Sequence, residues 1–261
     1  MLAGDARADD RDGRGKPPLD RPRARTAIEA ARGRLAAVPS PPSALGRVDS
    51  GNQSYVDVRV PLDRRAHVVW GADDDPRAVV YLPGHCGNDL AFTDWATAAR
   101  PHGTLVALLG DIACPGQGRF RWGPDLATID HRIVAALAAV GAARGRRLDS
   151  DVVTLVGYSE GALRAEGLAH RFPGRYRVVA LAGLPRPPRR DKLEHVRAAA
   201  VVAGEWDRAR TMREATGALA AAGLPARFFE LPGARHGEYG PDGTRVLGEA
   251  LQWLAERRDA R

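Results

Sequence analysis

The feature that most constrains this chain is a strand, a tight turn and a helix predicted around Ser159. Residues 152–156 are apolar and mostly β-branched, residues 157–161 read GYSEG, and residues 162–170 favour a helix. This order puts the serine at the apex of a sharp strand-to-helix turn. Glycines at 157 and 161 fit such a turn, because larger side chains there would collide with the neighbouring strand and helix.

A turn of this kind has a chemical consequence for Ser159. It lifts the hydroxyl above the edge of the sheet and holds it at a helix N-terminus, where free N–H groups favour developing negative charge. Two roles are open: a nucleophile, or a plain helix N-cap, for which serine is a preferred residue. The preceding strand and the paired glycines favour the nucleophile.

Strands and helices alternate along most of the chain. We predict eight strands, at residues 54–61, 66–71, 77–82, 104–109, 152–156, 177–182, 198–202 and 226–231. We predict helices at residues 89–99, 126–143, 162–170, 208–222 and 244–257. An antiparallel start followed by strand–helix units predicts an α/β fold: an eight-stranded, mostly parallel sheet with helices on both faces.

The N-terminal part has a different composition. Residues 1–24 are rich in Arg, Asp, Gly and Pro and are expected to be disordered. Residues 26–38 could form one short helix. We therefore expect residues 1–45 to be a disordered or loosely ordered extension and residues 46–261 to be the folded domain.

The positive charge does not indicate nucleic-acid binding. The formal net charge is +7, yet only Lys16 and Lys192 are lysines, and the arginines alternate with acidic residues. No basic stripe with spaced aromatic residues is present. No apolar run reaches the roughly 18 residues of a membrane span. We expect neither a nucleic-acid partner nor a membrane span; the oligomeric state stays open.

A nucleophilic serine needs a base and an acid that orients it, and in open parallel sheets such groups follow the carboxyl ends of strands. Asp207 follows the seventh predicted strand and His236 follows the eighth. Asp207 has an alternative role as the cap of the next helix, and Glu205 is a competing acid. We prefer Asp207 because its shorter side chain suits a rigid contact with an imidazole. His67 begins a strand, which would put it at the opposite rim.

Hydrolysis of an acyl group also needs donors for the oxyanion of the tetrahedral intermediate. The backbone N–H of Glu160, directly after the serine, would be one donor. The loop after the third strand reads PGHCGN from residue 83, and Gly84 would let this backbone approach the serine. The N–H of His85 is then the expected second donor. An ordinary glycine turn is the alternative.

With these positions together, the chain resembles the α/β-hydrolase superfamily over roughly residues 50–258. The resemblance implies that Ser159 is the nucleophile, His236 the base and then the acid, and Asp207 the orienting acid, with no metal or organic cofactor. Two departures stand out. The oxyanion loop has Pro-Gly where the superfamily usually has His-Gly, and the N-terminal extension matches nothing in the family.

The resemblance narrows the expected substrate. Residues 182–198 leave no room for a lid of two or more helices, as in small lidless esterases. We predict a serine hydrolase that cleaves carboxylic esters of small molecules through an acyl-enzyme. The alternatives are a thioesterase or peptidase with the same residues, or a non-catalytic binding protein of this fold. Trp122, Trp206 and Tyr158 are candidate pocket residues; Trp122 could instead anchor a surface loop.

Cys86 and Cys114 are the two cysteines of the chain, and both follow predicted neighbouring strands. A disulfide between them would indicate an oxidising, secreted or periplasmic setting after removal of a leader. Two free thiols would fit the cytoplasm. We lean towards the disulfide, and the compartment stays open.

Overall fold

The computed structural model describes residues 55–116 and 118–259, so the expectations for residues 1–45 lie outside the described residues. All eight predicted strands are present in one sheet. These strands are β1 (Val56–Val58), β2 (Ala66–Val69), β3 (Ala78–Leu82), β4 (Thr104–Ala107), β7 (Thr154–Tyr158), β8 (Val178–Ala182), β9 (Ala198–Gly204) and β10 (Ala226–Leu231).

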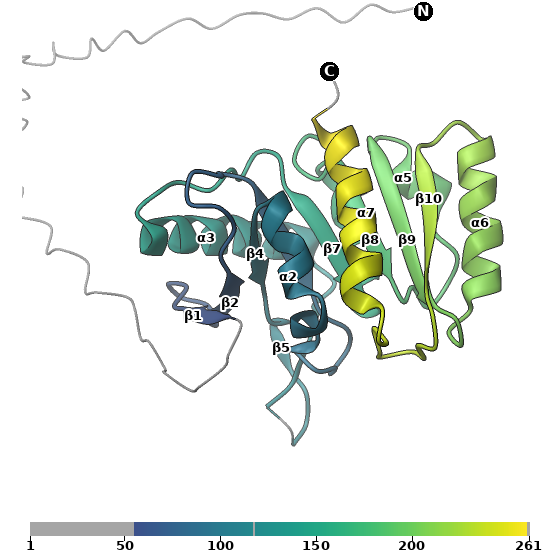
Figure 1. The fold of residues 1–261 in the computed structure, drawn as a ribbon. Helices are drawn as coiled ribbons and strands as arrows, with labels where there is room; N and C mark the ends of the chain where they lie inside the picture. Colours follow the sequence, from purple (N-terminus) through teal and green to yellow (C-terminus); the bar gives the residue numbers. More distant parts are fainter. Residues whose placement is uncertain (1–54, 117, 260–261) are drawn as a thin grey trace, which may run out of the picture. The chain divides into compact units, whose positions relative to one another are not determined.

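The strand order is β1-β2-β4-β3-β7-β8-β9-β10. β2 pairs antiparallel with β1 and with β4, and every other neighbouring pair is parallel (Figure 1). The predicted α/β fold with a mostly parallel sheet is therefore confirmed. Six neighbouring strands of the sheet are parallel: β4, β3, β7, β8, β9 and β10. Their carboxyl ends meet at one rim, where loops from distant parts of the sequence converge.

Helices cover both faces of the sheet (Figure 1). The helices are α2 (Ala96–Ala99), α3 (Leu126–Arg144), α4 (Glu160–Arg171), α5 (Arg190–Leu193), α6 (Ala209–Ala221) and α7 (Gly243–Arg258). Helices α2 and α7 pack on one face, and α3, α4 and α6 pack on the other. The core is thus two apolar layers separated by the sheet.

Strand β3 shows how the sequence builds both layers. All its residues are buried, and they alternate: Val79 and Tyr81 join the α2 and α7 layer, while Val80 and Leu82 join the α3 and α4 layer. A strand buried on both faces reads as a continuous apolar run for this reason. Each fully buried aliphatic side chain contributes about 1.5–3 kcal/mol of transfer free energy.

Two predictions of local structure need correction. The helix expected over residues 89–99 is broken into a 3-10 turn (Ala91–Asp94) and the short α2, with Trp95 at the break in a non-helical conformation at φ −136°. Trp95 is fully buried, so packing overrides the local helix preference. The small hairpin of β5 (Ile112–Ala113) and β6 (Phe120–Arg121) was not predicted, because strands this short carry no periodic signal.

Helix α3 is the one helix of the described ranges that is long and apolar enough, by length and composition, to cross a membrane. In this fold Ile129, Ile133 and Leu137 on it are buried against the sheet. That burial is what a core helix of an α/β domain requires.

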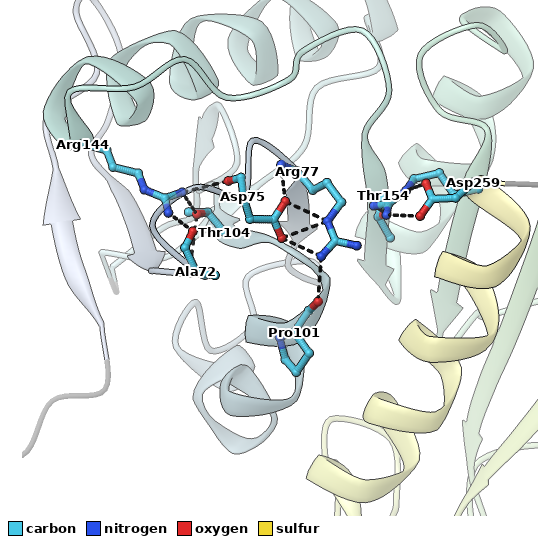
Figure 2. Close-up of polar contacts among 10 residues, drawn as sticks. Ala72, Asp75, Arg77, Pro101, Thr104, Arg144, Thr154 and Asp259 are labelled. Carbon is cyan, nitrogen blue, oxygen red and sulfur yellow. Dashed lines mark hydrogen bonds and ion pairs between the residues drawn. The ribbon is translucent and has the colours of Figure 1, made fainter.

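A polar network fixes the rim opposite the carboxyl ends of the parallel strands (Figure 2). The Arg77 guanidinium binds both carboxylate oxygens of Asp75, with Nη2 2.7 Å from Oδ2, and donates to the Pro101 carbonyl at 3.0 Å. Arg144 donates to the Asp75 carbonyl at 3.1 Å and to Thr104 Oγ1 at 2.9 Å. The network ties the starts of β3 and β4 to the end of α3.

Asp75→Asn should lower the free energy of unfolding by about 1 kcal/mol at pH 7, a small value because Arg77 is partly exposed. Burial raises the pKa of Asp75, but the hydrogen bonds and charge of Arg77 outweigh burial and lower it below 3.8. The ionised form therefore stabilises the fold above about pH 4, and this contribution disappears as the pH falls through the folded-state pKa.

Urea denaturation at pH 7 and at pH 3 measures the effect, with exposed Asp74→Asn as the matched control. The gap between parent and Asp75→Asn should narrow at pH 3. A gap of the same size at both values would contradict the assigned ion pair.

Candidate active site

Ser159 lies in a strained turn between β7 and α4. Its backbone has φ 51° and ψ −113°, a region that residues with a Cβ rarely occupy. A Cβ at Gly157 would collide with the carbonyl of Gly161, and a Cβ at Gly161 would collide with the carbonyl of Leu82. Ser159 occupies the N-cap position of α4, yet its side chain makes no capping hydrogen bond. The hydroxyl is therefore available for another partner.

That partner is the imidazole of His236. The Nε2 atom of His236 lies 3.2 Å from Ser159 Oγ, and its Nδ1 atom lies 2.7 Å from Asp207 Oδ2. The Asp207 side chain is 11% exposed and that of His236 is 48% exposed. The three side chains form one continuous hydrogen-bonded chain, which starts at a largely buried carboxylate and ends at a hydroxyl.

Packing between two loops brings Asp207 into place. Asp207 follows β9, and Gly204 at the end of that strand lies so close to the next loop that a Cβ would collide with the Ala234 carbonyl. The Trp206 N–H donates to the same carbonyl at 3.0 Å. Helix α6 has Arg208 at its N-cap position and no side-chain cap bond, so the Asp207 carboxylate does not cap it.

The loop that carries His236 is held at both ends. The competing acid, Glu205, accepts a hydrogen bond from the Gly233 N–H at 2.8 Å and so supports the loop rather than the imidazole. At the other end, Tyr158 Oη accepts from the Gly237 N–H. Burial raises the pKa of Tyr158 to about 12, so the phenol stays neutral beside the His236 ring, 5.6 Å away between centroids.

Two backbone N–H groups, those of Glu160 and His85, belong to segments that adjoin Ser159. The Glu160 N–H belongs to the first residue of α4 and has no acceptor within its helix. The loop after β3 brings His85 to the same rim, and Gly84 is close enough that a Cβ would lie 3.2 Å from Ser159 Cβ. Among the described residues, neither the Glu160 nor the His85 N–H donates to a backbone carbonyl.

The side chain of Glu160 makes contacts that the sequence does not predict. Its Oε2 atom lies 3.2 Å from His85 Nδ1 and accepts from the Trp122 N–H at 3.2 Å, while Oε1 accepts from Arg164 at 3.4 Å. One carboxylate thus joins the strained turn at Ser159, the loop after β3 and the segment before α3. No sequence signal pointed to this role, because the motif leaves that position variable.

The two tryptophans expected in the pocket lie elsewhere. Trp122 is 1% exposed, and its Nε1–H donates to the Pro83 carbonyl at 2.8 Å, so it anchors the loop after β3 from behind. Trp206 is 67% exposed and faces solvent. Of the three expected pocket residues, Tyr158 lines the cavity beside Ser159 and neither tryptophan does.

The structure joins Cys86 and Cys114 in a disulfide, with their Cα atoms 6.0 Å apart. Cys86 N–H donates to the Phe120 carbonyl at 3.0 Å, and Cys114 N–H donates to the Arg119 carbonyl at 2.8 Å. The bridge therefore connects the loop that carries His85 to the β5–β6 hairpin.

The order and direction of the strands, with helices on both faces of the sheet, are those of the α/β-hydrolase fold, and this protein has that fold. The carboxylesterase of Mesorhizobium loti is similar in structure, with a TM-score of 0.52 and 20% identity over 78% of this chain and 99% of its own. The dienelactone hydrolase of Anabaena variabilis has a TM-score of 0.54 and 16% identity over 79% and 98%. The thioesterase domain of the curacin pathway has a TM-score of 0.51 and 15% identity over 77% and 100%.

Sequence comparison adds little. No family model matches the chain. Siroheme synthase of Zymomonas mobilis is 41% identical over 61 residues, which are 23% of this chain and 11% of that protein. The chain thus spans about a tenth of the length of this curated relative.

Proposed function

We propose that this protein is a serine hydrolase that cleaves carboxylic esters through an acyl-enzyme, with Ser159, His236 and Asp207 as its catalytic residues. The observation that carries the proposal is the unbroken chain of hydrogen bonds from Asp207 Oδ2 through His236 to Ser159 Oγ. Carboxylesterases and a dienelactone hydrolase among the solved structures of this fold support an ester substrate.

The proposed chemistry follows from these contacts. Asp207 accepts a hydrogen bond from the Nδ1–H group of His236, which holds the neutral imidazole with Nε2 unprotonated and facing the serine hydroxyl. Nε2 takes the hydroxyl proton as Ser159 Oγ attacks the ester carbonyl carbon. The oxyanion is stabilised by the N–H groups of Glu160 and His85.

His236 then gives the proton to the alkoxy oxygen as the bond between carbonyl carbon and alkoxy oxygen breaks. Water enters from the open side, loses a proton to Nε2 and attacks the acyl carbon. Collapse of the second tetrahedral intermediate returns that proton to Ser159 and releases the carboxylic acid.

The open side of the site favours small, soluble esters. Between β8 and β9 the chain forms only the short α5, and the His236 side chain is about half exposed. A leaving alcohol can therefore depart directly into solvent. Thioesters are a second candidate, because the same residues can attack them and one similar structure is a thioesterase domain.

A fluorophosphonate probe tests the proposal directly. The probe should add one covalent group per chain, located on the peptide that contains Ser159, and should block hydrolysis of p-nitrophenyl acetate. A protein that neither reacts with the probe nor hydrolyses the ester would instead be a non-catalytic member of the fold.

Glu160→Gln should lower kcat by about 10–100-fold with little change in KM, because a carboxylate that orients the His85 loop acts on the oxyanion more than on substrate binding. Gln can keep one acceptor contact, so Glu160→Ala should lose more activity. Steady-state kinetics on p-nitrophenyl acetate measures both variants. A rise in KM with kcat unchanged would contradict the positioning role.

A further inference from the structure

The cavity beside Ser159 is small and closed at its base. Its volume is about 130 Å³, and Tyr81, Asn88, Ala91, Tyr158 and Tyr239 contribute to its walls. Tyr81 and Tyr239 are each 1% exposed. Each water in the liquid occupies about 30 Å³, and a cavity of about 150 Å³ accepts a benzene ring. This cavity therefore accepts a chain of about six non-hydrogen atoms.

The base of the cavity contains an unused hydroxyl proton. The hydroxyls of Tyr81 and Tyr239 lie 3.2 Å apart and share one hydrogen bond. A pair of phenols that shares one bond keeps one proton free, whichever hydroxyl donates. Burial raises the pKa of both phenols, so both stay protonated at neutral pH. In the arrangement found, Tyr239 donates to Tyr81, and Tyr81 keeps the free proton.

Asn88, in the wall of the cavity, contributes a second donor. Asn88 Oδ1 accepts from the Leu90 N–H at 3.0 Å. A backbone N–H can only donate, so this contact fixes the amide oxygen towards Leu90, and the NH₂ group of Asn88 has no acceptor among the described residues. Among the described residues, no Asp, Glu, Lys or Arg lines the cavity, and its basic side chains are the imidazoles of His85 and His236.

The acyl part of the substrate fits the enclosed side of the site. After the alcohol leaves, water must reach the acyl carbon beside His236 Nε2, so the alcohol side has to be open to solvent. His236 lines the cavity and its side chain is half exposed, so its imidazole lies where the cavity opens to solvent. The acyl chain is then left to occupy the cavity beside Ser159.

We propose that the cavity selects short acyl chains, of about six non-hydrogen atoms or fewer, that carry a neutral acceptor oxygen such as an ether or a ketone. The free proton of Tyr81 and the NH₂ group of Asn88 are the donors that recognise this oxygen. The inference depends on the proposed ester hydrolysis and adds the substrate class.

The test compares p-nitrophenyl butyrate with p-nitrophenyl methoxyacetate, in which an ether oxygen replaces one CH₂ of the same chain. Each kcat/KM is divided by the rate of hydroxide-catalysed hydrolysis of that ester, which removes the difference in intrinsic reactivity. The parent should prefer methoxyacetate by about tenfold, the size expected for one recovered hydrogen bond. The octanoate ester should react at least about tenfold more slowly than butyrate.

Two variants test which side chains cause the preference for methoxyacetate over butyrate. Tyr81→Phe keeps the ring and removes the donor, and Asn88→Asp keeps the acceptor for Leu90 and removes the NH₂ group; each should reduce the preference for methoxyacetate at least threefold. Tyr176→Phe is the matched control, because it removes a buried hydroxyl that binds Asp130 outside the cavity, and it should retain the preference. Asn88 lies on an exposed loop, so its variant tests the proposal even if Tyr81→Phe fails to fold.

The outcomes separate the two proposals. A parent that reacts with the fluorophosphonate probe but cleaves octanoate as fast as butyrate overturns the cavity proposal alone. So does a methoxyacetate preference that survives in Tyr81→Phe and in Asn88→Asp. A parent that neither reacts with the probe nor hydrolyses any of the esters overturns both proposals.

Discussion

Replacing Ser159 with alanine should reduce kcat for p-nitrophenyl acetate by about 10⁶-fold, the loss found when the nucleophile of such a constellation is removed. The hydroxyl is the group that His236 Nε2 faces, at 3.2 Å, and alanine has no atom to attack the ester. The covalent fluorophosphonate adduct should disappear as well. Since the Ser159 side chain makes no capping bond, the free energy of unfolding should change by less than about 1 kcal/mol.

Thermal unfolding distinguishes this result from loss of the fold, and Ser150→Ala in the loop between α3 and β7 provides the matched control. Ser150→Ala should keep the parental rate and the adduct. Hydrolysis at the parental rate by Ser159→Ala would show that another group is the nucleophile, and the proposed mechanism would be wrong.

The fold could be predicted because its sequence signals, short apolar runs that alternate with helical segments, are local and repeated along the chain. A fully buried parallel strand must be apolar on both faces, so runs such as residues 198–202 stand out from the surrounding helices. Alternation of these runs with helices then restricts the fold to a parallel sheet with two helical layers. The β5–β6 hairpin was not predicted because a strand of two residues is too short to show a periodic pattern.

The convergence of the three candidate side chains also follows from the direction of the strands. Strands that run parallel end at the same rim, so the sequence alone predicts that Asp207 and His236 lie there with Ser159. The same rule misplaced His67. Strand β2 runs antiparallel, so its start lies at the rim where the parallel strands end, and His67 pairs opposite Ala107 near the end of β4. There the Nδ1 atom of His67 lies 2.6 Å from the Oδ1 atom of Asp57.

Side-chain direction could not be predicted from the sequence. Trp122 and Trp206 both adjoin loops at the rim where the parallel strands end. Trp122 is buried and donates to the Pro83 carbonyl, whereas Trp206 is exposed. Whether an aromatic ring in a loop faces a cavity, the core or solvent depends on contacts between distant segments, and spacing along one segment contains no information about them. The contact between Glu160 and His85 was not predicted because it too joins two distant segments of the chain.

The second large effect is expected for Asp207→Asn, which should lower kcat by about 10⁴-fold. An asparagine amide can donate to His236 Nδ1, which moves the imidazole proton to Nε2 and leaves no base facing the Ser159 hydroxyl. The side chain keeps its size, so the protein should fold and bind the ester with a similar KM. The kcat measured by steady-state kinetics and the rate of fluorophosphonate labelling should decrease together.

Glu205→Gln distinguishes the two acids of this loop. The glutamine can still accept from the Gly233 N–H, so kcat should stay within about tenfold of the parent. The reverse order of losses, with Glu205→Gln the more damaged variant, would identify Glu205 as the acid that orients the imidazole in solution. Because Asp207 Oδ2 lies 2.7 Å from His236 Nδ1 while Glu205 binds the loop backbone, the geometry requires the larger loss at Asp207.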